Sequence, residues 1–200
     1  MPIRRLLLLA VVALLLGGCG YNDIQVNDER TKATWAEVIN QYKRRADLIP
    51  NLVKTVEGYA VHEKSVLTDV TEARARVGSV LAGPELQQDP KALASFQAAQ
   101  GQLSSALSRL LVVVERYPEL KADASFRDLQ AQLEGTENRI AVARNRYIRA
   151  VENYNVSVRT FPNNLLAMTL GYDAKPNFAV DEEAAISAPP GVEFGTRPAR

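Results

Sequence analysis

The feature that most constrains the fold of this chain is an apolar repeat with a spacing of seven residues between Asp28 and Leu81. One position of the repeat is polar only at Glu63 and is occupied by Trp35, Tyr42, Ile49, Val56, Glu63, Val70 and Val77. Two neighbouring positions, which begin at Val38 and Ile39, are mostly apolar as well. Three adjacent positions form a stripe as wide as the face that a helix buries in a bundle. Unbroken, the repeat predicts a helix about 80 Å long.

Pro50 interrupts this repeat. Proline has no N–H to donate to the carbonyl of Ala46, and its ring clashes with that carbonyl, so the helix must kink or break. The repeat keeps its phase across Pro50, which favours one kinked helix. A straight rod would carry Trp35 and its neighbours beyond the reach of the shorter helices that follow. That argument favours a reversal near Asp47 or packing against another molecule. The single kinked helix and the reversal both stay open, with the kinked helix slightly favoured.

Two further long helices follow. The second is expected to begin at Asp89, an N-cap residue followed by Pro90 at the first helical position, and to end before Pro118. The third runs from about residue 123 to residue 161. Residues 165–170 can form a short amphipathic segment that the glycine after it caps.

The sequence therefore predicts an all-α protein, because no strand-like alternation occurs and short polar connections between long helices favour antiparallel packing. We expect residues 28–178 to form an elongated antiparallel bundle of three long helices, the first kinked at Pro50, or of four if that helix breaks there. Residues 179–200 are rich in proline and small residues and have no period, which predicts a disordered tail.

The N-terminus has the layout of a secretory signal peptide, with Arg4 and Arg5 ahead of a short apolar run, Leu6–Leu16. Two glycines then lead into Cys19, the single cysteine of the chain. The order Leu-Gly-Gly-Cys resembles the lipobox of bacterial lipoproteins, in which the thiol takes a diacylglyceryl group. A transmembrane helix would need about 20 apolar residues, and cleavage elsewhere would leave a free thiol. The pattern favours a lipoprotein signal peptide over residues 1–18 and lipidation of Cys19.

Lipidation would hold the mature chain on a membrane outside the cytoplasm, since two or three acyl chains make a lasting anchor. Residues 19–27 are then expected to form a short polar tether. Gly20 follows the cysteine, in place of the aspartate that is associated with retention at the inner membrane. In a cell with two membranes, we therefore favour the periplasmic face of the outer membrane.

Composition argues against several classes of partner and site. The chain has 24 basic and 23 acidic residues, and loss of a leader with Arg4 and Arg5 would bring the net charge to about −1. A nucleic-acid binder would show a concentrated basic surface instead. Once Cys19 is acylated, no thiol remains for a disulfide, a zinc site or catalysis. We expect no nucleic-acid partner, no cofactor and no metal.

The single histidine, His62, stands before Glu63, as in the H-E-x-x-H motif of metalloproteases. The second histidine of that motif would fall at position 66, which is Val66, so zinc would have too few ligands. We expect Glu63 to pair with a basic residue of a neighbouring helix. No glycine-rich phosphate loop, serine–histidine pairing or carboxylate cluster with metal spacing is present, which predicts no catalytic residue and no small-molecule substrate.

The segment Lys43–Asn51, together with Trp35, is the candidate interaction surface. The alternatives are a solvated face or contact with anionic lipid head groups, which would add only about 1 kcal/mol for each basic residue. The residues of this expected surface are Trp35, Lys43, Arg44, Arg45, Asp47, Pro50 and Asn51.

Two stretches resemble the LemA family. Residues 42–63, YKRRADLIPNLVKTVEGYAVHE, are similar to the family's signature segment, and residues 143–167, ARNRYIRAVENYNVSVRTFPNNLLA, to its arginine–tyrosine–asparagine segment. The resemblance implies a membrane-tethered, extracytoplasmic helical bundle with no established enzymatic activity. Two departures stand out: family members commonly carry an N-terminal transmembrane helix, and Ile148 stands where the family usually has asparagine.

The function expected from these features is that of a lipid-anchored, non-catalytic scaffold or interaction protein of the cell envelope, which binds a protein partner or a second copy of itself. Two alternatives remain. The chain is a hydrolase whose carboxylates converge from several helices, or it regulates an envelope protease.

Overall fold

The computed structural model describes residues 2–81 and 86–178, with side chains described for residues 20–80 and 86–178. The disordered tail expected over residues 179–200 therefore lies outside the described residues, as does the side chain of Cys19. Within the described ranges every element is a helix and no strand occurs, which confirms the all-α class. The helices are α1 (Pro2–Glu57), α2 (Lys64–Leu81), α3 (Pro90–Val114), α4 (Pro118–Ala122), α5 (Ala124–Arg159) and α6 (Asn163–Leu170).

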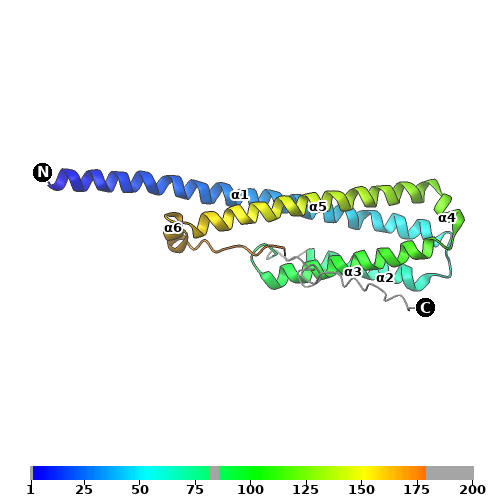
Figure 1. Ribbon diagram of the computed structural model, residues 1–200. Coiled ribbons are helices and arrows are strands. Elements are labelled where there is room, and N and C mark those ends of the chain that lie inside the picture. Colours follow the sequence, from blue (N-terminus) through cyan, green and yellow to red (C-terminus); the bar gives the residue numbers. More distant parts are fainter. Residues whose placement is uncertain (1, 82–85, 179–200) are drawn as a thin grey trace, which may run out of the picture.

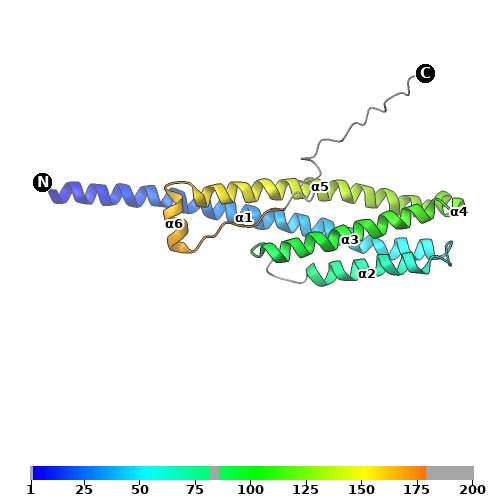
Figure 2. The same cartoon turned by 60° about the horizontal axis from the view of Figure 1, so that its bottom comes forward.

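The bundle is elongated and antiparallel, as expected. Helices α1 and α5 run side by side in opposite directions and share the longest interface (Figure 1). Helices α2 and α3 form a second antiparallel pair, which lies along the part of α1 that is farther from the N-terminus (Figure 2). Toward the N-terminus, α6 lies against the α1–α5 pair and takes the place of the second pair.

Helix α1 passes through Pro50 without ending there and continues to Glu57. The chain reverses at residues 58–63, later than the break considered near Pro50. The helix continues through Pro50 because the carbonyl of Ala46 finds another donor. Within α1 this carbonyl would accept from the N–H of residue 50, which proline lacks. Arg74 Nε of α2 donates to that oxygen at 2.9 Å, so the helix tolerates proline without an unsatisfied carbonyl. Because the reversal at residues 58–63 separates α1 from α2, the described residues contain four long helices: α1, α2, α3 and α5.

Three apolar clusters follow one another along the rod. The distal cluster, farthest from the N-terminus, is mainly aliphatic and includes Ile49, Leu52, Val70, Leu103 and Leu110. The aromatic cluster lies next to it and includes Trp35, Tyr42, Phe96, Tyr147 and Phe178. The proximal cluster is the smallest and consists of Ile24, Tyr154, Val158 and Ala167.

Other rings of the aromatic cluster cover the side chain of Trp35. Its ring centroid lies 5.0 Å from that of Tyr147 on α5 and 5.8 Å from that of Phe96 on α3. Phe178, at the end of the described chain, lies 5.9 Å away. Trp35 is therefore packed within this chain and needs no second molecule to bury it.

Residues 20–27 are helical and belong to α1, in contrast to the polar tether expected for residues 19–27. Ile24 is fully buried because α5 and α6 supply Tyr154, Val158 and Ala167 around it. Those partners are far away in the sequence, so the local polarity of the segment gave no sign of them. None of the helices, as far as they are described, has the length and hydropathy of a membrane span.

The expected start of α3 and the expected cap of α6 are confirmed. Asp89 Oδ1 accepts from the backbone N–H of Lys91 at 2.8 Å, with Pro90 at the start of α3. Gly171 ends α6 with a φ of 73°, a conformation that glycine adopts without a steric penalty. Glu63 also pairs with a basic residue, since its Oε1 lies 3.0 Å from Arg116 Nη2, but Arg116 lies in the turn between α3 and α4 and not on a neighbouring helix as expected.

Candidate functional site

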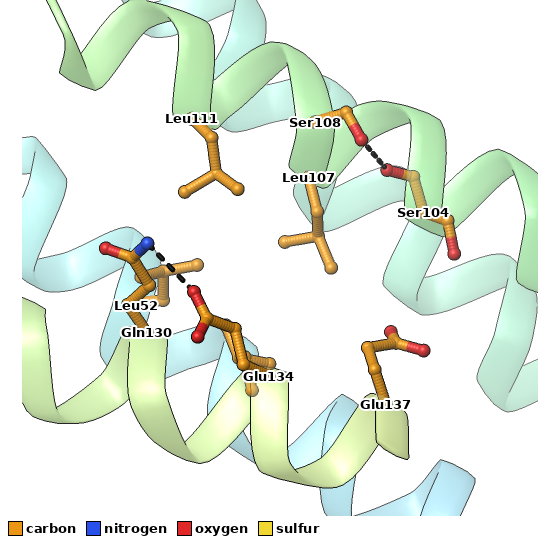
Figure 3. A pocket seen from close by; sticks show the side chains of 9 residues that line it. Leu52, Ser104, Leu107, Ser108, Leu111, Gln130, Glu134 and Glu137 are labelled. Atoms are coloured by element: carbon orange, nitrogen blue, oxygen red, sulfur yellow. Dashed lines mark hydrogen bonds between the residues drawn. The ribbon is translucent and has the colours of Figure 1, made fainter. Parts of the chain in front are cut away.

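An apolar groove lies between α3 and α5, with a volume of about 240 Å³. Leu107 and Leu111 point into it from α3, and Leu52 of α1 lies at its base (Figure 3). Leu133 closes the α5 side. Its polar lining residues are Ser104, Ser108, Gln130, Glu134 and Glu137.

The groove exists because α3 and α5 each have a different main neighbour. Helix α3 packs chiefly against α2, and α5 packs chiefly against α1. Leu103 and Leu110 are buried in the distal cluster, whereas Leu107 is half-buried and Leu111 is exposed. Helix α3 thus carries apolar residues that its packing against α2 does not bury. Two of them, Leu107 and Leu111, line the groove.

The rim of the groove on the α5 side is acidic. Glu134 Oε1 accepts a hydrogen bond from Gln130 Nε2 at 3.1 Å, a contact within α5. Across the groove, Ser108 Oγ donates to the carbonyl of Ser104 at 3.0 Å, so this hydroxyl is used within α3 (Figure 3). The site combines an apolar base with carboxylates on one edge.

A buried arginine, Arg45, binds two of the residues that line the groove, Ser104 and Glu137. Arg45 is only 2% exposed, and its Nη1 lies 2.5 Å from Glu137 Oε1 on α5 and 3.1 Å from Ser104 Oγ on α3. Its Nη2 donates to the Oε1 and to the carbonyl of Gln100. One guanidinium therefore ties α1, α3 and α5 together, since arginine carries several donors in a fixed fork.

The structure divides the expected interaction surface into two groups. Trp35 and Arg45 are buried, so they are core residues and not part of a surface. Arg45 occupies the same repeat position as Val38 and Leu52, which was a sign of burial in the sequence. The remaining residues are exposed on α1: Lys43, Arg44, Asp47, Pro50 and Asn51.

A polar hollow of about 430 Å³ lies nearer the N-terminus, between α1 and the segment after α6. Lys175 Nζ lies 2.5 Å from Asp28 Oδ1 and 2.9 Å from Thr31 Oγ1, and it sits 4.7 Å from the centroid of the Tyr154 ring. Burial acts to raise the pKa of Asp28, but hydrogen bonds and charge from Lys175 and Lys32 outweigh it and lower that pKa. The polar groups here hold the segment after α6 against α1.

The groove does not gather carboxylates from several helices, because Glu134 and Glu137 both come from α5 and Glu137 is paired with Arg45. In the described part of the chain, no group of three or more His, Cys, Asp or Glu side chains is placed to hold a metal ion. Burial raises the pKa of Tyr147 to about 12, so this phenol stays protonated near neutral pH. The arrangement suits binding of an apolar surface better than acid–base chemistry.

Comparison with known proteins gives a family model and curated relatives. The model described as the LemA family matches residues 34–194. Two relatives from Paramagnetospirillum magneticum, Magnetosome protein MamQ 2 and Magnetosome protein MamQ 1, are each 29% identical over 188 residues, which covers 86% of this chain and 68% of the relative. Magnetosome protein MamQ of Magnetospirillum gryphiswaldense is 28% identical with the same coverage.

Proposed function

Because the chain belongs to the LemA family, we propose that it is a non-catalytic interaction protein of the cell envelope, anchored through acyl chains on Cys19. The anchor rests on the order of basic residues, short apolar run and Leu-Gly-Gly-Cys at the N-terminus. In a cell with two membranes, the proposed location is the periplasmic face of the outer membrane. Intact-mass spectrometry of the mature protein tests the anchor: acyl mass on an N-terminal Cys19 supports it, and an unmodified thiol contradicts it.

The observation that carries the interaction role is the groove between α3 and α5. It presents leucine side chains from three helices beside carboxylates on one rim. Amphipathic helices bind grooves of this kind by placing their apolar face on the base. The partner that fits is therefore an amphipathic helix of another protein, with a basic residue on the side that meets Glu134.

The exposed residues of the expected surface remain a second proposed contact. Lys43, Arg44, Asp47 and Asn51 lie together on the outer side of α1, away from the groove floor that Leu52 forms. Charged and polar residues at the exposed rim of an interface contribute more to orientation and specificity than to affinity, and this is the role we propose for them.

The curated relatives are called magnetosome proteins, a name that states no enzymatic activity and is compatible with a non-catalytic role for this chain. A regulator of an envelope protease would use the same groove, and the identity of the captured partner separates it from a scaffold. Among the residues that the structure describes, no specific contact favours the hydrolase alternative.

Two neighbouring substitutions on α3 test the groove. Leu111 lines it, whereas Val112 is 69% exposed and is not among its lining residues. We expect Leu111→Asp to release the partner from detergent-extracted protein, because a carboxylate would be buried against the partner's apolar face, and Val112→Asp to retain it. Mass measurement of each complex reads the result. A wild-type chain that is a strict monomer, or a partner that both variants retain, would contradict the proposal.

A further inference from the structure

Exposed apolar side chains gather on and just before α6. Phe161 is 79% exposed, Met168 is 77% exposed and Leu165 is 52% exposed, and Leu170 is exposed as well. Single exposed apolar residues are common on protein surfaces and need no explanation. Leu165 and Met168 are three residues apart and are neighbours on the surface of α6, and contiguous exposed apolar area of this kind marks a contact with another apolar phase.

The patch and the core contact lie on different sides of α6. Ala167 is buried in the proximal cluster against Ile24 and Tyr154, which fixes the inward face. Leu165 and Met168 are three residues apart and share the outward side. Since the inward face already holds α6 on the bundle, the outward residues are not needed for folding.

Helix α6 lies directly beside the point where the chain would be anchored. A Cβ added at Gly20 would collide with the side chain of Asn163 and approach Leu166, so α1 and α6 are in close contact there. Gly20 is the residue after Cys19, and the apolar run Leu6–Leu16 lies just ahead of it. Figure 2 shows α6 lying across the α1–α5 pair where the N-terminal part of α1 leaves the bundle.

The charge of this segment suits a bilayer surface. Between Arg159 and Tyr172 the sequence contains no acidic residue and no second basic one. Arg159 is exposed at the end of α5, next to the patch. A segment without carboxylates does not repel anionic lipid head groups, and the charge of Arg159 is attracted to them.

We propose that the outward face of α6, with Phe161 ahead of it, inserts into the lipid surface and seats the bundle on the membrane. This inference rests on the proposed function in one respect, because anchoring at Cys19 is what brings α6 to the bilayer. This contact between α6 and lipid, which we call the seat, restricts rotation of the bundle about its anchor. The groove between α3 and α5 is then held at a defined distance from the membrane and in a defined orientation.

The test uses the purified full chain, reconstituted into vesicles of phosphatidylethanolamine and phosphatidylglycerol that contain a photoactivatable phospholipid. We expect lipid adducts at Phe161, Leu165 and Met168. Val61 and Val112 are exposed valines outside α6 and serve as internal controls. Adducts that are as frequent on these valines as on α6 would overturn the proposal.

A double variant gives a second readout. Phe161→Ser with Met168→Gln removes exposed apolar area and leaves the inward face of α6 intact, so the bundle should fold. We expect adducts on residues 160–171 to fall by roughly tenfold, as partition into lipid scales with apolar area. The control, Val61→Ser with Val112→Gln, should leave them unchanged. An unchanged yield in the double variant would contradict the seat.

The intact mass of the same sample separates this inference from the proposed function. An unmodified Cys19 with adducts on α6 would refute the acyl anchor and still support the seat. An acylated Cys19 without adducts on α6 would support the anchor and overturn the seat. Because no partner protein is present, the outcome does not depend on the groove.

Discussion

The two ends of the rod bury the same stripe of α1 in different ways. At the distal end, α2, α3 and α5 cover it with aliphatic side chains such as Leu103 and Leu110. At the proximal end α2 and α3 no longer take part, and α6 with the segment after it covers α1 in their place. This irregular segment depends on polar contacts, among them Asn155 Nδ2 to the carbonyl of Lys175 at 2.9 Å.

The difference shows how the chain is held together where few apolar side chains are buried, as in the proximal cluster. A regular helix satisfies its own backbone groups, so the distal end needs only apolar packing. The proximal segment has no such pattern and uses side chains to hold its backbone: the N–H of Lys175 donates to Asn155 Oδ1 at 2.8 Å, and Asn177 Nδ2 donates to the carbonyl of Ile148. The distal end should therefore set global stability, and the proximal end should open locally.

The largest expected effect comes from truncating the distal cluster. Leu103 is fully buried, and Leu103→Ala should lower the free energy of unfolding by about 3 kcal/mol through lost transfer energy and a cavity. Ile24 is equally buried, but Ile24→Ala should cost less than about 1.5 kcal/mol globally, because the proximal end can open on its own. Urea denaturation followed by circular dichroism measures both. Equal losses would show that the two ends unfold as one unit.

An intermediate effect is expected at the junction of three helices. Arg45→Ala leaves Gln100 and Glu137 without their guanidinium partner, and we expect a loss of about 2 kcal/mol because Glu137 is partly solvated. Arg44 is exposed beside it, so Arg44→Ala should change stability by less than about 0.5 kcal/mol. Thermal unfolding of the pair gives the comparison. A neutral Arg45→Ala would mean that the buried charge contributes no net stability.

The smallest effect is a local response to acid at the proximal end. The pKa of Asp28 is lowered in the folded chain, so its pair with Lys175 contributes stability above the unfolded pKa of about 3.9. That contribution is lost as the pH falls through the lower, folded value. We expect the segment that ends at Phe178 to loosen there, which changes the emission of Trp35, the single tryptophan. Asp28→Asn should remove this step, and an unchanged step would assign it to another group.

Much of the fold could be predicted because helix signals are local. The cap at Asp89 and the glycine after α6 both follow from residue type and spacing. The reversal at residues 58–63 could not be located, because the repeat keeps its phase from Val56 to Val70 on both sides of it. Helices α1 and α2 bury the same kind of face, so the pattern looks continuous.

The site was harder to predict than the fold. The groove depends on the distance between α3 and α5, which no sequence spacing specifies, although the surplus of leucines at positions 107 and 111 was visible. Arg45 stood in an apolar repeat position, and its basic neighbours Lys43 and Arg44 drew it into the expected surface. Ile24 is covered by residues more than a hundred positions away, which local polarity does not reveal.

The most direct test of the central claim is site-specific photocrosslinking in intact cells, with a photoreactive amino acid at position 111 in one chain and at position 112 in another. The account predicts a discrete protein adduct from position 111, which lines the groove, and none from position 112. It also predicts that Cys19→Ser weakens the adduct, because the anchor brings the groove to its partner. Equal adducts from the two positions, or none from either, would contradict it.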